Sequence, residues 1–198
     1  NYQLSLSERL GRSDSKEQYA FIYNPAKVNV LKSFQFEDKK GLFERPPYSL
    51  LLESPSEATV AFFTGVHVKP DNAPQEISDL VQVYEEYASS SDDLVAKTIR
   101  TNWLLMGDMN ADCKYVHESD WKDIKLYTDS RFTWLIKTGE DTTVADKPCA
   151  YDRFVTTNTG TWVQSVDIYD FGKAFKLDEE EEKKVSDHKP IEIRLNWK

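Results

Sequence analysis

Short apolar runs, separated by turn-forming residues, follow one another along most of the chain. Many of these runs are rich in Val, Ile, Phe and Tyr, which favour strands on a packed surface. We expect strands at residues 19–24, 28–36, 48–52, 59–68, 103–106, 154–157 and 191–197. The run 103–106 is apolar throughout, which is typical of a strand that is buried on both faces.

Two segments carry a helical pattern instead. In residues 74–87 the apolar side chains recur near a helical period, and the segment starts with a proline, which is favoured in the first turn of a helix. Residues 178–184 predict a short helix capped by its aspartate, with glutamates at the favourable amino end. Residues 39–47 and 88–97 are predicted to be surface loops because they collect Gly, Pro, Ser and Asp.

Length and composition indicate one globular domain over residues 1–198. Hydrophobic residues make up 39% of the chain, yet no apolar run approaches the roughly 20 residues that a membrane crossing needs. Strands dominate and helices are interspersed, which predicts an α/β or α+β sandwich around one core. The chain begins at Asn1 without a signal region, so a signal peptide has been removed or the protein begins before this residue.

Charge and cysteine content leave two questions open. The net charge is −9, which provides no overall basic surface for nucleic acid, so a phosphodiester-cleaving enzyme would need bound cations at its site. An acidic protein without a nucleic-acid partner is the alternative. Cys113 and Cys149 are the two cysteines; they form either one disulfide in an oxidising compartment or two unrelated buried thiols.

Polar side chains follow the apolar run 103–106. Gly107 is expected to let the chain turn sharply, and Asp108 and Asn110 are expected to alternate and point the same way. The carboxylate of Asp108 suits Mg²⁺, and the amide of Asn110 can donate to a phosphate oxygen without adding charge. An Asx turn at the end of a strand is the alternative.

Two histidines also lie beside predicted strand ends. Asp187 and His188 face opposite ways if extended, so Asp187 is assigned to a metal, and Asp152 is the natural carboxylate to orient His188. His67 ends another strand, where Glu17 could orient it. Taken singly, each histidine also fits an imidazole with a purely structural role, and Glu17 fits a solvated charge.

At these residues the chain resembles the deoxyribonuclease I family. The resemblance is carried by Gly-Asp-x-Asn-Ala-Asp-Cys, Cys-Ala-Tyr-Asp-Arg and Ser-Asp-His-x-Pro in this order, and it runs from about Tyr2 to Leu195. It implies a four-layer α/β sandwich of two central mixed β-sheets flanked by helices. It also implies a secreted endonuclease that uses Mg²⁺ in catalysis and Ca²⁺ for structure, with DNA as substrate and no membrane partner.

The resemblance assigns roles to individual residues. The catalytic pairs it implies are Glu17 with His67 and Asp152 with His188, which act as general acid and base in either order and leave a 5′-phosphate end. The residues implied in phosphate or DNA binding are Asn110, Arg45 and Arg12. The metal positions it implies are Asp108 and Asp187 for Mg²⁺ and Asp141 for Ca²⁺, and Cys113 with Cys149 matches a structural disulfide.

The sequence also departs from the family pattern. The family is longer at its amino end, where one strand brings a metal-binding Glu, so we expect that this chain alone is neither fully folded nor fully active. A companion fragment, an amino-terminal segment before Asn1, or a genuinely reduced protein would each explain this. Ser15 replaces a tyrosine that packs against DNA, and the stretch Leu4 to Ser7 is altered, so actin binding is not predicted. A non-catalytic binding module and a phosphodiesterase for another substrate stay open as alternatives.

Overall fold

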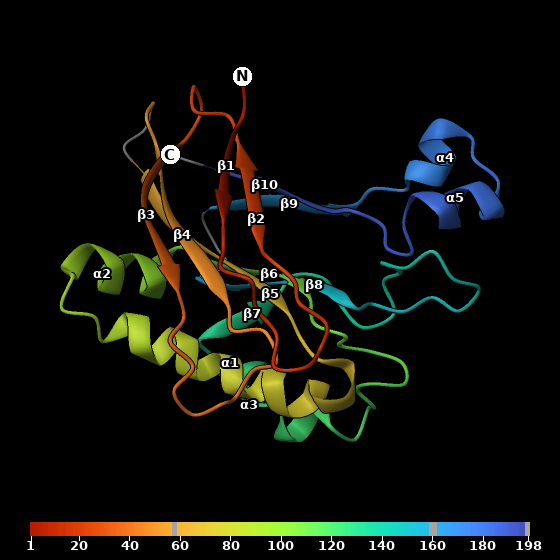
Figure 1. Ribbon diagram of the computed structural model, residues 1–198, viewed down its shortest axis with the longest axis horizontal. Coiled ribbons are helices and arrows are strands. Elements are labelled where there is room, and N and C mark those ends of the chain that lie inside the picture. Colours follow the sequence, from red (N-terminus) through yellow and green to blue (C-terminus); the bar gives the residue numbers. More distant parts are fainter. Residues whose placement is uncertain (57–58, 159–161, 197–198) are drawn as a thin grey trace.

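A six-stranded mixed sheet forms the centre of the protein (Figure 1). The computed structural model describes residues 1–56, 59–158 and 162–196. The strands, in their order across the sheet, are β3 (Asn29–Gln35), β4 (Tyr48–Ser54), β5 (Thr59–His67), β6 (Trp103–Asp108), β8 (Asp152–Thr157) and β7 (Phe132–Trp134). The pair β5–β6 is parallel, and the other neighbouring pairs are antiparallel. A parallel pair needs a long crossover, which here runs through two helices.

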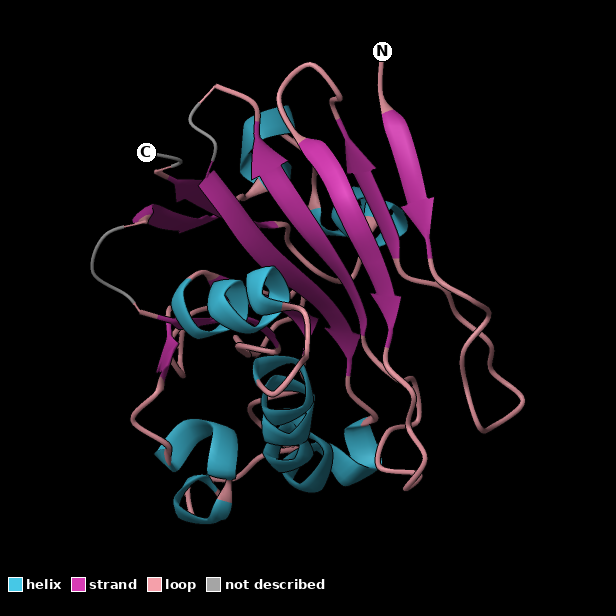
Figure 2. Ribbon diagram, turned by 90° about the vertical axis from the view of Figure 1, so that its left-hand side faces the viewer, coloured by secondary structure: helices cyan, strands magenta, loops and turns pink. Residues whose placement is uncertain are grey.

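Helices cover one face of this sheet, as Figure 2 shows with the helices in cyan. They are α1 (Ala73–Ala88), α2 (Asp93–Thr101) and the short α3 (Lys125–Thr128), with single 3₁₀ turns at η1 (Pro70–Asn72) and η2 (Trp121–Asp123). The larger core lies between them, and it includes Leu51, Phe62, Leu105 and Val155 of the sheet and Ile77, Leu80 and Val83 of α1. Removing these side chains from water stabilises the arrangement of helices on sheet. In the described part of the chain, none of the helices has the length and apolar character that a membrane crossing requires.

The loop predicted at residues 88–97 is wrong in its second half. Asp92 accepts hydrogen bonds from the N–H groups of Leu94 and Val95, which caps helix α2. Val95 and Ile99, one helical turn apart, are then buried in the core. The polar residues up to Asp92 led to the prediction of a loop, because the apolar face that stabilises the helix starts only after its cap.

Two small antiparallel hairpins cover the other face. β1 (Gln3–Leu6) pairs with β2 (Ala20–Tyr23), and β9 (Val163–Ile168) pairs with β10 (Ile191–Leu195). A second core lies between these hairpins and the central sheet, and it contains Leu50, Phe63, Leu104, Phe154 and Trp162. The α/β class is confirmed, with one difference in detail. Within the described residues the second layer consists of two separate sheets, because each hairpin forms its hydrogen bonds only within itself.

Most predicted elements correspond to an observed one. The strands at 19–24, 28–36, 48–52, 59–68, 103–106 and 154–157 correspond to β2, β3, β4, β5, β6 and β8. The strand at 191–197 corresponds to β10, and its last predicted residue lies outside the described residues. The strands β1, β7 and β9 were not predicted. In β1 both leucines are exposed, β7 has only 3 residues, and in β9 two consecutive polar residues interrupt the alternation of apolar and polar positions.

Helices α4 (Phe171–Phe175) and α5 (Glu179–Val185) form an arm between β9 and β10, at the right of Figure 1. The predicted cap of α5 is confirmed. Asp178 accepts a hydrogen bond from the N–H of Glu181, and the Glu181 side chain accepts one from the N–H of Asp178. This reciprocal capping box satisfies two N–H groups that have no partner within the helix.

Gly107 has a different role from the one expected. The chain does not turn after it, because β6 continues to Asp108. Gly107 has φ of +135°, and a Cβ atom at this position would lie 2.1 Å from the carbonyl oxygen of Val66 on the neighbouring strand. Only glycine therefore allows β5 and β6 to approach here, and this close approach sets the edge of the sheet where the candidate site lies.

Glu44 fastens the loop 8–18 to the loop that precedes β4. Its carboxylate is buried and accepts hydrogen bonds from the main-chain N–H groups of Arg12 and Ser13, at 2.8 and 2.7 Å, and from the Ser13 hydroxyl at 2.7 Å. The bonds from Ser13 are the main reason that the pKa of Glu44 falls from 4.5 to about 2. The ionised form is therefore the one that stabilises the fold.

Glu44→Gln is expected to lower the free energy of unfolding by about 1.5–3 kcal/mol at pH 7, since hydrogen bonds to a charged group are lost. The folded pKa of Glu44 is depressed, so its contribution is present above pH 4.5 and disappears as the pH falls towards about 2. Urea unfolding at pH 7 and pH 3 measures this, with the exposed Glu118→Gln as control. An equal loss at both pH values would contradict a role for the charge.

Candidate active site

Three neighbouring strands end at the same level on one edge of the central sheet. In the strand register His67 of β5 lies opposite Asp108 of β6, and Asp108 lies opposite Asp152 of β8. One imidazole and two carboxylates are therefore placed side by side by the sheet itself. Because successive side chains of a strand point to opposite faces, a slip of one of these strands by one residue would turn its site residue away from the other two.

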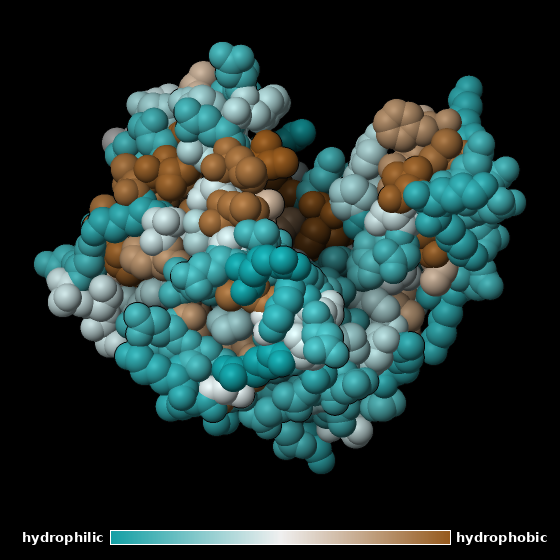
Figure 3. All heavy atoms as spheres, viewed as in Figure 1, coloured by the Kyte–Doolittle hydropathy of each residue, from teal (hydrophilic) through white to brown (hydrophobic). Residues whose placement is uncertain are grey.

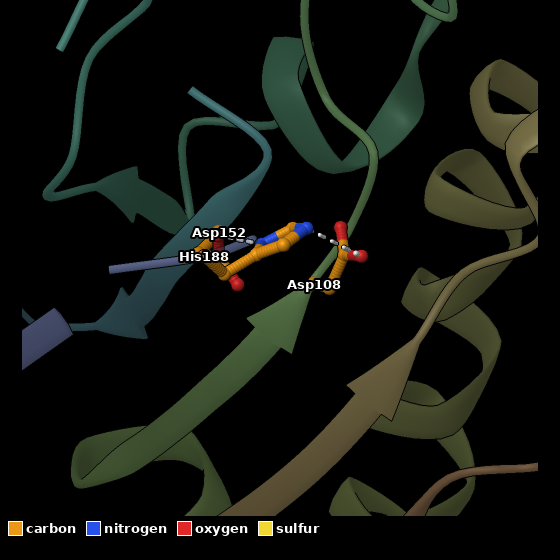
Figure 4. Close-up of side chains that lie close together, drawn as sticks. All are labelled: Asp108, Asp152 and His188. Carbon is orange, nitrogen blue, oxygen red and sulfur yellow. Dashed lines mark hydrogen bonds and ion pairs between the residues drawn. The ribbon is translucent and has the colours of Figure 1, made fainter. Parts of the chain in front are cut away.

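His188 joins this edge from the segment that precedes β10. An isolated bridge between Thr143 and His188 holds its main chain. Its Nδ1 donates to Oδ2 of Asp152 at 2.7 Å, and its Nε2 lies 3.9 Å from Oδ2 of Asp108, so the ring lies between the two carboxylates (Figure 4). The bond to Asp152 is the main cause that raises the pKa of His188 to about 9, and the charges of the surrounding carboxylates add to it.

His67 is arranged in a matching way on the opposite side of Asp108. Its Nδ1 donates to Oε2 of Glu17 at 2.6 Å, and its Nε2 lies 3.6 Å from Oδ2 of Asp108. Glu17 is held by two main-chain hydrogen bonds to Leu10. A carboxylate bound at Nδ1 keeps the proton of a neutral imidazole on that nitrogen and leaves Nε2 to accept. Both histidines therefore present Nε2 to the same oxygen of Asp108.

Asp108, Asp152 and His188 form the candidate cation site. One ligand atom from each lies within 4.8 Å of the others, and all three residues are half-buried. Burial raises the pKa of Asp108, and the charge of Asp152 acts in the same direction. A divalent cation would relieve this crowding of negative charge, and the carboxylates supply the hard oxygen ligands that Mg²⁺ prefers. The donor set of this site fits such an ion.

Asp187 does not belong to this group. Its side chain is exposed, and its main-chain oxygen accepts a hydrogen bond from the N–H of Val144. In the described residues the second carboxylate of the cation site is Asp152 instead. The alternation of Asp187 and His188 along an extended chain separates their side chains, as expected, but the carboxylate on the metal side comes from a strand distant in sequence.

Asn110 leaves the extended conformation, so the predicted alternation with Asp108 is wrong. Its φ is +49°, and its N–H donates to Oδ1 of Asp108 at 2.8 Å, which is an Asx turn. The side chain is buried, and Nδ2 donates to the carbonyl oxygen of Val68 at 2.9 Å. The turn therefore orients one oxygen of Asp108 and ties the end of β6 to the end of β5.

The two arginines assigned to DNA contacts lie in different surroundings. The side chain of Arg12 is half exposed and pairs with Asp38 at 2.9 Å. The side chain of Arg45 is 8% exposed, and its Nη1 donates to Oε1 of Glu17 at 2.8 Å. The side chain of Arg12 thus remains partly open to solvent, whereas Arg45 is directed into the protein towards the carboxylate that orients His67.

Asp141, the position expected to bind calcium, already has donors on both carboxylate oxygens. Oδ1 accepts from the N–H and hydroxyl of Thr143, both at 3.1 Å, and Oδ2 accepts from the Lys189 ammonium at 2.6 Å. These contacts lower the pKa of Asp141 against the opposing effect of burial. Because Lys189 places a positive charge against this carboxylate, the donor set does not fit a calcium ion, and we derive no role for calcium here.

The disulfide between Cys113 and Cys149 is present, with a Cα–Cα distance of 5.9 Å. It joins the segment that follows β6 to the residues that precede β8. Asp108 and Asp152 lie at the ends of these same strands, so the disulfide restrains both carboxylates of the cation site.

An apolar groove of about 730 Å³ adjoins His188 and runs along the arm of α4 and α5. Tyr169, Phe171, Phe175 and Pro190 are among its lining residues. Figure 3 shows hydrophobic side chains in brown in the hollow between this arm and the body of the protein. One side of the His188 ring therefore faces apolar residues, and the other side faces two carboxylates.

Sequence reasoning missed Tyr19 and Lys189, which hold site residues in place. The Tyr19 hydroxyl accepts a hydrogen bond from the N–H of His67 at 3.0 Å, and Lys189 pairs with Asp141. Tyr19 lies two residues from Glu17, but an aromatic residue at the start of a strand is indistinguishable from a core residue. Lys189 follows His188 directly, so its proximity to a candidate residue was the one available signal.

Comparisons with known proteins identify relatives of this chain. The chain is 40% identical to human deoxyribonuclease gamma, covering 98% of this chain and 65% of that protein. It is 38% identical to sheep deoxyribonuclease-1, covering 98% of this chain and 76% of that protein. The chain thus spans slightly less than two thirds of the length of deoxyribonuclease gamma and about three quarters of deoxyribonuclease-1. No family model matches it.

Solved structures share its fold at much lower identity. An endonuclease/exonuclease/phosphatase protein from Bacteroides vulgatus has a TM-score of 0.64 at 17% identity, covering 100% of this chain and 77% of that one. A mannosyl-6-phosphatase from Bacteroides thetaiotaomicron has a TM-score of 0.63 at 14% identity, covering 98% and 77%. These similarities show the fold alone, because one fold can serve different functions in different proteins.

Proposed function

Because this chain belongs to the deoxyribonuclease I family, we propose that it provides the active site of a divalent-metal-dependent endonuclease that hydrolyses DNA phosphodiester bonds. One observation carries the proposal. Two imidazoles, each bound at Nδ1 by its own carboxylate, present Nε2 to one oxygen of Asp108 at 3.6 and 3.9 Å. A phosphate placed beside Oδ2 of Asp108 would have one imidazole on each side, one to accept a proton and the other to donate one.

His188 is the base in this proposal. Asp152 fixes its Nδ1 proton and stabilises the ring when it becomes charged, and Nε2 then positions the attacking water and takes its proton. The high pKa of His188, about 9, belongs to a site without a cation, and positive charge placed beside the ring acts to lower it.

His67 is the acid. Glu17 stabilises its protonated form through Nδ1, and Nε2 donates the proton to the departing 3′ oxygen, which leaves a 5′-phosphate end. Each proton transfer of this kind accelerates the reaction by roughly 10²–10⁴-fold. Because the two pairs are arranged alike, His67 could instead be the base and His188 the acid, and a substrate with a 3′-bridging sulfur distinguishes the two assignments.

Asp108 and Asp152 are the residues that would hold Mg²⁺, with His188 nearby. A bound Mg²⁺ would neutralise phosphate charge and stabilise the charge that develops during hydrolysis. The net charge of −9 makes this neutralisation important, since the protein as a whole repels DNA. Arg12 is the exposed arginine that we assign to the DNA backbone. The disulfide supports an oxidising location, and we propose that the protein is secreted.

The experiment that tests this function is cleavage of supercoiled plasmid by the purified protein. With Mg²⁺ we expect nicks that a DNA ligase reseals directly, because the ends carry 5′-phosphate and 3′-hydroxyl groups. Chelation with EDTA should stop cleavage, and renewed Mg²⁺ should restore it. Absence of nicking together with release of phosphorylated headgroups from phospholipid vesicles would instead indicate another phosphodiester substrate. Absence of any turnover would indicate a binding module.

A further inference from the structure

Arg45 lies within the protein, in the segment that connects β3 to β4. Its side chain is 8% exposed, so most of its surface is unavailable to a bound nucleic acid. The guanidinium instead forms two internal hydrogen bonds: Nη1 donates to Oε1 of Glu17 at 2.8 Å, and Nε donates to the carbonyl oxygen of His67 at 3.1 Å. One planar group thus contacts both members of the pair on this side of Asp108.

The two carboxylate oxygens of Glu17 bind different partners, the guanidinium of Arg45 and the imidazole of His67. Oε1 accepts from Arg45, and Oε2 accepts from Nδ1 of His67 at 2.6 Å. A carboxylate bound at one oxygen alone can rotate, whereas this one is held at both. The rigid guanidinium plane bonds Glu17 through Nη1 and the His67 carbonyl through Nε, and a lysine ammonium lacks this pair of fixed donors.

Tyr19 also joins Arg45 to His67, through their main-chain groups. Its hydroxyl donates to the carbonyl oxygen of Arg45 at 3.1 Å and accepts from the N–H of His67 at 3.0 Å. Burial raises the pKa of Tyr19, so the hydroxyl keeps its proton. Both main-chain polar groups of His67 are therefore held, the N–H by Tyr19 and the carbonyl by Arg45.

From these contacts we propose that Arg45 is a positioning residue for His67 and not a contact to DNA phosphate. It holds the Glu17 carboxylate and the main chain of His67 together, which directs Nε2 of the imidazole towards Asp108. The inference rests on the proposed nuclease function, because it assigns a role within that site. It reverses the assignment of Arg45 to DNA binding that the family resemblance implied.

Steady-state kinetics with Arg45→Met distinguish the two roles. Methionine keeps the length of the side chain and removes its charge and donors. If Arg45 is a positioning residue, the substitution should lower kcat by about 10- to 100-fold, as the loss of a group that orients a functional histidine does. KM should stay within about twofold of the wild-type value. The slope of log KM against log salt concentration should stay unchanged. A rise in KM with constant kcat and a slope flattened by about one would show a phosphate contact and overturn the proposal.

Two further variants sharpen the comparison. Arg100→Met makes the same substitution at an exposed arginine of α2, at the opposite end of the sheet, and should leave kcat, KM and the salt slope unchanged. Arg45→Lys keeps the charge but cannot bond Glu17 and His67 together, so its kcat should stay low. Wild-type kcat in Arg45→Lys would overturn the proposal. If Arg45→Met does not fold, as judged by circular dichroism, the lysine variant decides alone.

Nuclear magnetic resonance of the imidazole nitrogens tests the proposal without turnover. In the wild-type protein the neutral ring of His67 should carry its proton on Nδ1, and in Arg45→Met both tautomers should be populated. His117, which is exposed and distant in sequence, serves as the internal reference. If the wild-type protein does not cleave DNA, the proposed function fails, while this tautomer change still supports the role of Arg45. An unchanged His67 tautomer in the variant would overturn it.

Discussion

His188→Ala is expected to slow metal-dependent DNA cleavage by about 10²–10⁴-fold with little change in KM. The ring donates a hydrogen bond to Asp152 from Nδ1 and faces the reacting edge with Nε2, so its loss removes a proton transfer and not a DNA contact. His67→Ala should have an effect of the same size, since Glu17 holds that ring in the matching position. Initial rates of nicking over a range of DNA concentrations measure kcat and KM for both variants.

His117→Ala is the matched control, because this exposed histidine contacts Asp120 outside the site. Its kcat should equal that of the wild-type protein. A substrate with a 3′-bridging sulfur tells acid from base, since a thiolate leaves without a proton more readily than an alkoxide. We expect this substrate to restore cleavage by His67→Ala and not by His188→Ala. Retention of wild-type kcat in His188→Ala would contradict the two-pair mechanism.

Asp108→Asn is the second substitution with a large expected effect. Asparagine keeps the shape of the side chain and can still accept the N–H of Asn110, so the turn after β6 is preserved. It removes the charge that both Nε2 atoms face and one oxygen ligand of the cation site. Affinity for Mg²⁺ should fall by about 10- to 100-fold, and kcat by at least as much. Isothermal titration calorimetry with Mg²⁺ alone gives the affinity independently of activity.

Asp187→Asn provides the comparison for that experiment. Because Asp187 is exposed and lies outside the group formed by Asp108, Asp152 and His188, its substitution should leave Mg²⁺ affinity within about twofold of the wild-type value. An equal loss of affinity in both variants would reinstate Asp187 as a ligand. Unchanged affinity in Asp108→Asn would show that the cation binds elsewhere.

Local patterns predicted the framework of the site well. Strands β5 and β6 were recognised by their apolar runs, which in β6 are continuous as burial on both faces dictates, and β8 was recognised by its β-branched and aromatic residues. His67 and Asp108 at the ends of β5 and β6, and Asp152 at the start of β8, then had to lie near the edge of a sheet. Their register was not predictable, because it depends on pairings between residues far apart in sequence.

Local patterns failed where a distant partner decides the outcome. Asn110 looked like the next residue of an extended strand, but Asp108 and Val68 bind it in a left-handed turn. For Asn110 the sequence left an Asx turn open as the alternative, and this is the conformation that the structure adopts. Arg45 was assigned to DNA phosphate by the resemblance alone, whereas the fold buries it against Glu17.

The sequence by itself thus determined the α/β class, the catalytic candidates and the two cysteines, because burial periodicity and residue chemistry are local properties. The pairs of Glu17 with His67 and of Asp152 with His188 were expected, but only the tertiary structure decided that both rings converge on one oxygen of Asp108. It also decided that Lys189 occupies the carboxylate of Asp141. These outcomes depend on distances between segments far apart along the chain, which the packing of the two cores sets and no local pattern encodes.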